Sequence, residues 1–156
     1  MTAITPKAPT HANLPPLASR FVDVPGIAWE RSAIYPGIET KTLIVDPASG
    51  LLTMLMRMQP GAKIPDHEHV QIEQTYVLEG SLVCGEGECK AGDFVWRPAG
   101  SRHEAWAGSQ GGLLLGMFQM PNRFFKAGGA VEDFLGNNWE QRWGKALERQ
   151  EQAQFS

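Results

Sequence analysis

The sequence contains few cysteines, no long apolar run and no cluster of basic residues. Two cysteines among 156 residues are too few for a disulfide framework. No apolar run approaches the roughly 18 residues that a membrane-spanning helix needs, so we expect no membrane partner. Lys and Arg total 14, Asp and Glu total 17, and the formal net charge is −3. The basic residues are scattered, which argues against a nucleic-acid partner, because phosphate binding needs a concentrated basic face.

The first twenty residues also lack the charged-then-apolar order of a secretory signal. We therefore expect an intracellular protein located in the cytoplasm. Cys84 and Cys89 flank residues 85–88, whose Gly-Glu-Gly-Glu sequence is typical of a hairpin tip. The two thiols could face each other across that turn, but free thiols are the preferred interpretation in a reducing compartment. The sequence leaves their pairing open.

Composition divides the chain into three parts. Residues 1–20 are rich in Pro, Thr and Ala without periodicity, which predicts an extended or disordered N-terminal arm. In residues 21–136, short apolar runs alternate with turns that contain Gly and Pro, a pattern typical of an all-β sandwich or barrel. The predicted strands are Thr42–Val45, Leu51–Met58, Gln74–Leu78, Ser81–Cys84, Asp93–Arg97 and Leu113–Met120.

Residues 137–156 differ from the rest in their periodicity. Trp139, Trp143 and Leu147 follow at steps of four, which predicts an amphipathic helix from Trp139 to about Gln152. Asn138 is the expected N-cap, with Gln141 at the third helical position. The apolar stripe of this helix is expected to pack on the barrel or on a second subunit.

Three of the four histidines lie in two segments that carry the chemistry. Side chains alternate along a strand, so His67 and His69 share one face, and Glu73 has the same parity. His103 opens a later strand and can approach from the opposite side. Such a group is costly inside a barrel unless a cation compensates it, and imidazole and carboxylate are the usual ligands of zinc, iron, manganese or nickel. The sequence thus predicts one divalent metal ion held by His67, His69, Glu73 and His103.

A lone strand histidine is more often a tolerated structural residue than a ligand, but three histidines and a glutamate at these spacings favour the metal site. Glu68 and Glu104 have the opposite parity to the ligands, so we expect them outside the site.

The two segments resemble the two motifs of the cupin family. Gly61, His67, His69, Glu73 and Gly80 match the first motif without a gap, and Gly92, Pro98, Gly100 and His103 match the second. The family pattern often has Asn four residues after the last His, where this chain has Ala107; that Asn is not a metal ligand. The resemblance implies a cupin double-stranded β-helix, the jelly-roll barrel, and the four metal ligands named above.

Within that family, residues 67–80 and the Pro-Asn-Arg-Phe-Phe run from residue 121 are similar to two groups. One comprises small single-domain dioxygenases that cleave acetylacetone or dihydroxyacetophenone, some of which use three histidines alone. The other is the zinc-binding ChrR-type cupin domain of an anti-sigma factor. The first implies iron(II) and oxidative cleavage of a C–C bond in a small diketone or hydroxyaryl ketone, which we favour. The second implies a zinc-bound sensory or regulatory module without turnover.

A metal-dependent isomerase, lyase or hydrolase is a third possibility, and Glu68, Glu104 or Tyr76 would then be the nominees for a general base.

Residues near the motifs suggest the kind of substrate. Leu52, Met54, Met56 and Met58 form one alternating face, with Phe94 and Trp96 on another strand, which suits a small, partly apolar molecule. Plain core packing is the alternative for each of them. Arg57 or Arg97 could neutralise an acidic substrate, although such an arginine is more often a solvated edge residue. Exposed sheet edges and the N-terminal arm predict a homodimer.

Overall fold

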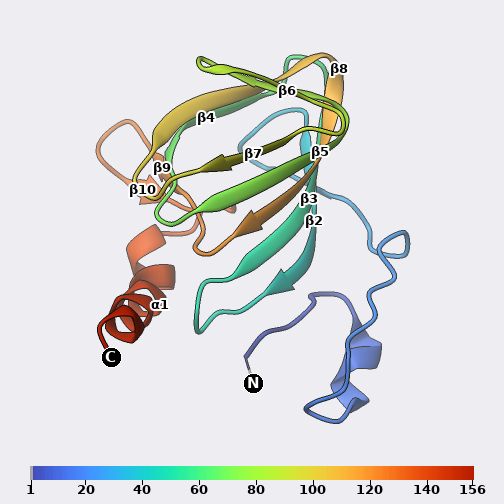
Figure 1. The fold of residues 1–156 in the computed structure, drawn as a ribbon, viewed down its shortest axis with the longest axis vertical. Coiled ribbons are helices and arrows are strands. Elements are labelled where there is room, and N and C mark those ends of the chain that lie inside the picture. Colours follow the sequence, from blue (N-terminus) through green and yellow to red (C-terminus); the bar gives the residue numbers. More distant parts are fainter. Residues whose placement is uncertain (1) are drawn as a thin grey trace.

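The computed structural model describes residues 2–156; Met1, the first residue of the predicted arm, lies outside the described residues. Figure 1 shows a curled antiparallel β-structure with one α-helix near the C-terminus. In chain order the elements are a 3₁₀ helix (Pro9–Asn13), β1 (Glu30–Arg31), β2 (Ile38–Val45), β3 (Leu52–Met58), β4 (Lys63–Glu68), β5 (Glu73–Cys84), β6 (Gly87–Lys90), β7 (Phe94–Arg97), β8 (Arg102–Phe118), β9 (Arg123–Phe125), β10 (Val131–Glu132) and α1 (Trp139–Gln154). The predicted all-β fold class is confirmed.

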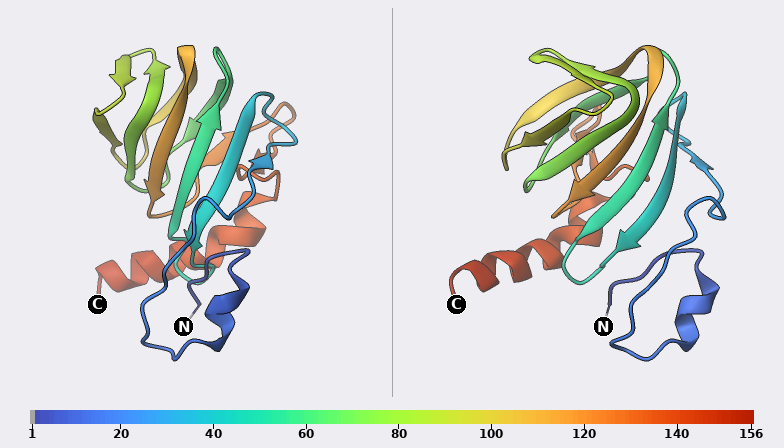
Figure 2. Two further views of the ribbon diagram at one scale, coloured as in Figure 1. Left: turned by 90° about the vertical axis from the view of Figure 1, so that its right-hand side faces the viewer. Right: turned by 45° about the vertical axis from the view of Figure 1, so that its right-hand side comes forward.

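Strand β8 is the longest strand and connects the other parts of the barrel. Its 17 residues pair with β4 through its first part, with β3 through its last part, and with β5 along both. The order β1-β2-β3-β8-β4-β9-β10 forms one continuous path, while β6 and β7 both pair with β5. Every strand pairing is antiparallel. Figure 2 shows how this long strand curls the sheet over itself.

The sheet bends sharply where two glycines of β5 and β8 meet. Gly80 and Gly111 both have positive φ, at 66° and 73°, and a Cβ atom on Gly80 would lie 2.0 Å from the carbonyl oxygen of Gly111. No side chain fits that crossing, so the backbones can approach closely only because both residues are glycine. The pairing of β5 with β8 also shifts register on both sides of Gly80, which adds to the bend.

This bend explains one difference from the sequence prediction. We expected separate strands over Gln74–Leu78 and Ser81–Cys84, with a turn at Glu79-Gly80. The structure has a single strand, β5, that continues through Gly80. Cys84 lies opposite Gly87 and Cys89 lies opposite Leu82, so the two cysteines are not direct cross-strand partners, and both are free.

The main core fills the inside of the barrel. Its buried members include Ile38, Met58, Val77 and Leu114, and the strands alternate between these inward residues and outward polar ones. Burial of such side chains contributes on the order of 1.5–3 kcal/mol each. The enclosed interior is what allows a polar site to be held apart from bulk water.

Helix α1 packs on the end of the barrel through a second, smaller core. Trp139, Trp143 and Ala146 are buried against Met120, at the step of three to four residues expected of an amphipathic helix. The side chain of Asn138 accepts a hydrogen bond from the backbone N–H of Gln141 at 3.0 Å, which confirms the predicted cap. The indole N–H of Trp139 donates to the carbonyl oxygen of Pro121 at 2.9 Å, so the helix fastens the chain segment that follows β8.

The N-terminal segment runs along the lower side of the molecule in Figure 1. Ile4 forms two backbone hydrogen bonds with Val45, of 2.8 and 2.9 Å, so the segment touches the end of β2. Leu17 and Phe21 are almost fully exposed. Among residues 2–156, no helix combines the length and the apolar character needed to cross a membrane.

Candidate metal centre

Three histidines from β4, the bend after it and β8 meet inside the barrel. His67 lies in β4 directly opposite His103 of β8 in the antiparallel ladder. A register shift between Ile64 and His67 places both of these residues in the interior, although they are three positions apart. His69 follows the end of β4, and its backbone exchanges hydrogen bonds with Gly100 and Ser101, of 2.6 and 2.8 Å. The turn that contains Pro98 and Gly100 thus locks the two halves of the site together.

The three rings present their nitrogens to one another. The Nε2 atoms of His69 and His103 are 2.8 Å apart, and one nitrogen from each of His67, His69 and His103 lies within 4.8 Å of the others. Neighbouring nitrogen ligands of one ion, each bound at about 2.1 Å, are about 3 Å apart, so this spacing suits a shared metal. His67 and His69 are buried, and His103 is partly exposed. The three histidines could together hold a metal ion.

Hydrogen bonding and burial put these rings in the state that a metal requires. The Nδ1 atom of His67 lies 2.7 Å from the carbonyl oxygen of Pro65, which can only accept, so Nδ1 carries the proton and Nε2 keeps its lone pair. Burial lowers the pKa of His67, and burial together with the positive charge of Arg97 lowers the pKa of His103 to about 3. The rings of His67 and His103 are therefore neutral at pH 7. Neutral imidazole is the form that binds a cation.

Glu73, the first residue of β5, lies next to the three histidines. Its Oε2 atom lies 2.5 Å from Nδ1 of His69, and its Oε1 atom accepts a hydrogen bond of 3.0 Å from the hydroxyl of Thr75. Burial alone would raise the pKa of Glu73, but the contact with His69 outweighs it, so the pKa is lowered and the carboxylate is ionised. In this position Glu73 orients His69, as carboxylates commonly do for metal-bound histidines. Direct ligation by Glu73 stays a prediction.

His67 and His103 lie in the wall of a cavity inside the barrel, whereas His69 is fully buried and does not line it. The wall is mostly apolar and holds few polar side chains. It is lined by Leu52, Met54, Met56, Ile64, His67, Glu73, Thr75, Leu82, Arg97, His103, Ala105, Leu114, Gly116, Phe118, Pro121, Asn122, Phe124 and Phe134.

The structure corrects the predicted surroundings in two places. Leu52, Met54 and Met56 line the cavity as expected, whereas Met58 belongs to the core. Phe94 and Trp96 do not line it: they lie on the outer face of β7, and their exposed fractions are 50% and 57%. The reason is the pairing of β7 with β5, which turns the alternate residues of β7 inward.

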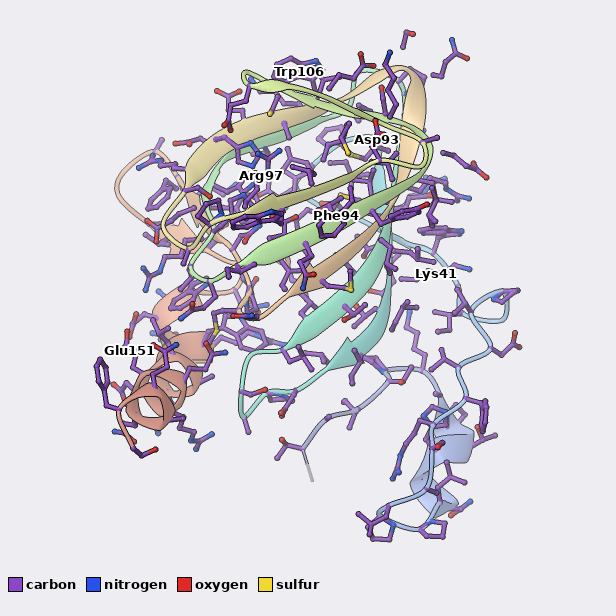
Figure 3. All side chains as sticks on the ribbon, viewed as in Figure 1. Lys41, Asp93, Phe94, Arg97, Trp106 and Glu151 are labelled. Atoms are coloured by element: carbon purple, nitrogen blue, oxygen red, sulfur yellow. The ribbon has the colours of Figure 1, made fainter. Side chains whose placement is uncertain are left out.

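Of the two arginines predicted as possible substrate ligands, one lines the cavity and the other does not. Arg97 lines the cavity, whereas Arg57 lies outside it, where it forms an ion pair with Glu39 and stacks over Trp29. Phe94 and Arg97, both on β7, are labelled in Figure 3.

The nominated general bases also lie away from the cavity wall. Glu68 pairs with Arg123 at 3.3 Å, Glu104 pairs with Lys63, and Tyr76 is exposed on the outer face of β5. The expectation that Glu68 and Glu104 lie outside the site agrees with these contacts.

Sequence reasoning missed Thr75, Asn122, Phe124 and Phe134 in the cavity wall. The Pro-Asn-Arg-Phe-Phe run was the available signal for Asn122 and Phe124, but it did not show which of its side chains point inward.

Similar solved structures carry several different functions. An acetylacetone dioxygenase from Acinetobacter johnsonii has a TM-score of 0.67 and 18% identity, and the match covers 87% of this chain and 96% of that chain. A chain of the complex of SigE with the anti-sigma ChrR from Rhodobacter sphaeroides has a TM-score of 0.53 and 21% identity, with 61% and 51% covered. The polyketide cyclase RemF from Streptomyces resistomycificus has a TM-score of 0.55 and 22% identity, with 70% and 89% covered. These likenesses establish the fold alone.

No curated protein matches the sequence. The model of the ChrR cupin-like domain family matches residues 18–122, which is most of the chain and includes all three histidines. The cupin resemblance drawn from the motifs and the jelly-roll fold that it implied are confirmed. The chain belongs to the ChrR cupin-like domain family.

Proposed function

We propose that this protein is a non-haem iron(II) dioxygenase that cleaves a C–C bond in a small diketone or hydroxyaryl ketone. The observation that carries the proposal is the set of three convergent histidine nitrogens, of which those of His67 and His103 belong to rings that line a mostly apolar cavity. Iron(II) bound there would supply oxygen activation beside a chelated enolate. The choice of diketone cleavage among cupin chemistries is suggested by the acetylacetone dioxygenase from Acinetobacter johnsonii, whose fold matches over 87% of this chain.

The chain's own residues give the cavity its properties. His67, His69 and His103 bind the ion, and Glu73 either joins them or fixes the orientation of His69. Leu52, Met54 and Phe118 form walls that exclude water and fit the carbon skeleton of a small ketone. Three or four protein ligands leave positions free on a metal that accepts six, so both a bidentate substrate and oxygen can reach it.

A zinc-bound regulatory module is the second candidate. The family model that matches residues 18–122 is named for ChrR, and the ChrR–SigE complex is among the similar structures. This candidate predicts tightly held zinc and no oxygen uptake.

Isomerase or lyase chemistry is less favoured. Glu68, Glu104 and Tyr76 do not line the cavity, which leaves Glu73 as the carboxylate in its wall.

Oxygen uptake by protein stripped of metal and reloaded anaerobically with iron(II) tests the proposal. The substrates are a panel of β-diketones and hydroxyaryl ketones, and the control is zinc-loaded protein. We expect uptake that requires iron and one panel member, and that disappears in His103→Ala. No uptake across the panel, with zinc retained through purification, would instead support the regulatory module.

A homodimer and a cytoplasmic location belong to the same proposal and stay predictions. Sedimentation velocity tests the first: a dimer is expected, and a monomer at every concentration would contradict it.

A further inference from the structure

Strand β7 exposes its two aromatic side chains and buries most of its one charged side chain. Phe94 and Trp96 point outward, and their exposed fractions are 50% and 57%. Val95 and Arg97 point inward. The side chain of Arg97 is only 12% exposed. Charged residues are rarely buried unless they are paired, and a shift by one residue would exchange the two faces. The register that buries Arg97 therefore leaves two large aromatic side chains exposed and a cationic side chain inside the barrel wall.

The guanidinium of Arg97 has weak partners within the described chain. Its Nη1 atom lies 3.5 Å from a carboxylate oxygen of Glu86, whose side chain is 83% exposed, and its Nη2 atom lies 3.5 Å from the sulfur of Cys84. A charge-assisted N–H···O bond is normally 2.7–2.9 Å long. Glu73 is the cross-strand neighbour of Arg97, yet its carboxylate contacts His69 and Thr75 instead. The donors of Arg97 are thus largely unused at the wall of the cavity.

A second polar group in the same wall also lacks a partner. The Oδ1 atom of Asn122 is buried, and among residues 2–156 it accepts no hydrogen bond. A buried polar atom without a partner costs free energy on the order of 1–3 kcal/mol, which a bound ligand can recover. Apart from the histidines, Glu73 and Thr75, the remaining wall is almost entirely apolar. The cavity therefore offers one cation and one hydrogen-bonding amide in an otherwise apolar lining.

From this arrangement we propose that Arg97 determines specificity by binding the carboxylate of a small anionic substrate, whose keto or enol oxygens face the three histidines. A guanidinium and a carboxylate form two parallel hydrogen bonds, which fix the position and the orientation of the ligand together. The inference deepens the proposed function and depends on it. It narrows the substrate from diketones in general to keto acids that carry a carboxylate at one end.

Two compounds of the same shape separate charge from skeleton. Acetylacetone is a neutral β-diketone, and acetylpyruvate is the same molecule with one terminal methyl group replaced by a carboxylate. Pyruvate, which has a carboxylate but no β-diketone, is the third probe. Binding to zinc-loaded protein is measured by isothermal titration calorimetry, because zinc has no redox chemistry and the ligand is not consumed. The proteins are the wild type, Arg97→Gln, Arg97→Lys and the matched surface control Arg57→Gln, and the zinc content of each is measured first.

We expect the wild type and Arg57→Gln to bind acetylpyruvate on the order of ten- to a hundredfold more tightly than acetylacetone. Arg97→Gln should reduce this ratio to about one with zinc content unchanged, and Arg97→Lys should restore part of it, because lysine keeps the charge but loses the paired geometry. A purely structural role would change both affinities alike and leave their ratio intact.

The remaining outcomes distinguish a failure of this inference from a failure of the proposed function. A wild-type ratio near one, or a ratio unchanged in Arg97→Gln, overturns the inference. If neither diketone binds but pyruvate binds in an Arg97-dependent manner, the diketone chemistry fails while carboxylate recognition stands. If none of the three probes binds to protein that holds its zinc, both proposals fail.

Discussion

The inner and outer faces of strands β5 and β7 differ in the polarity of their side chains, and the sequence of neither strand alone predicts this difference. The inner face carries Glu73, Thr75 and Arg97, which are polar or charged and shielded from water. The outer face carries Tyr76 and Phe94, which are large, aromatic and exposed. An ordinary half-buried sheet has the opposite arrangement, with apolar residues inside and polar residues outside. The inversion at this point teaches that the inner face of these strands supplies polar groups to the cavity as well as apolar groups to the core.

The largest expected effect of a substitution falls on the inner histidines. His67→Ala or His103→Ala should remove most of the bound metal, because each deletes one of the three convergent nitrogens. His11→Ala, in the N-terminal segment, is the matched control and should leave the metal content unchanged. Atomic spectrometry on the purified proteins measures the result. Near-stoichiometric metal in either barrel variant would show that the site is wrongly assigned.

A smaller loss is expected at Glu73. Glu73→Gln should weaken metal affinity by on the order of 10- to 100-fold and leave the fold intact, since the amide keeps the shape but loses the charge beside His69. Glu79→Gln, an exposed position on the same strand, should leave the affinity unchanged. Competition with a chelator of known affinity measures both. Equal affinities in the two variants would mean that Glu73 neither ligates nor orients a ligand.

Neighbouring residues of β5 should differ in their contribution to stability. Val77 is fully buried and Leu78 is 42% exposed. Val77→Ala should lower the free energy of unfolding of metal-free protein by about 2 kcal/mol, through lost burial and the cavity left behind. Leu78→Ala should change it by less than about 0.5 kcal/mol. Urea unfolding gives both values, and similar losses would indicate that Leu78 is covered in solution.

The smallest effect concerns the two tyrosines at alkaline pH. Burial, and then the charges of Glu132 and Asp133, raise the pKa of Tyr35 to about 12. The unfolded chain releases this proton near pH 10, so the native state loses stability as pH rises from 10 towards 12. Tyr35→Phe should flatten the alkaline decline in unfolding midpoint, with Tyr76→Phe as the control from the outer face. An unchanged decline in Tyr35→Phe would contradict the prediction.

The sequence predicts the cluster of three histidines well, because each of the two motifs that contain them is a short local pattern. The period-two spacing of His67 and His69, and the turn that precedes His103, identify the three residues, and the pairing of β4 with β8 then brings their rings together. The C-terminal helix was equally predictable, since its cap and its tryptophan spacing depend only on nearby residues.

The rest of the site depends on register, which distant residues decide. Whether Phe94 or Arg97 faces inward follows from the pairing of β7 with β5, and the bend of β5 follows from its crossing with β8 at Gly111. The orientation of β7 cannot be predicted from its four residues alone, nor can the bend of β5 be predicted from β5 alone. Asn122 lines the cavity next to Pro121, whose carbonyl group accepts a hydrogen bond from Trp139, far along the chain. Such contacts are not encoded in any one segment.

The long reach of β8 has a consequence for how the protein folds. His69 and His103 are separated by 34 positions, and they meet only after β8 has paired with the strands that precede it. Pairings between distant segments form slowly, because the loop between them must close before any contact compensates the lost entropy. A nascent chain that has not yet docked β8 brings together at most two of the three rings. Metal capture is therefore expected as a late event in folding, and its rate can serve as a kinetic marker for completion of the barrel.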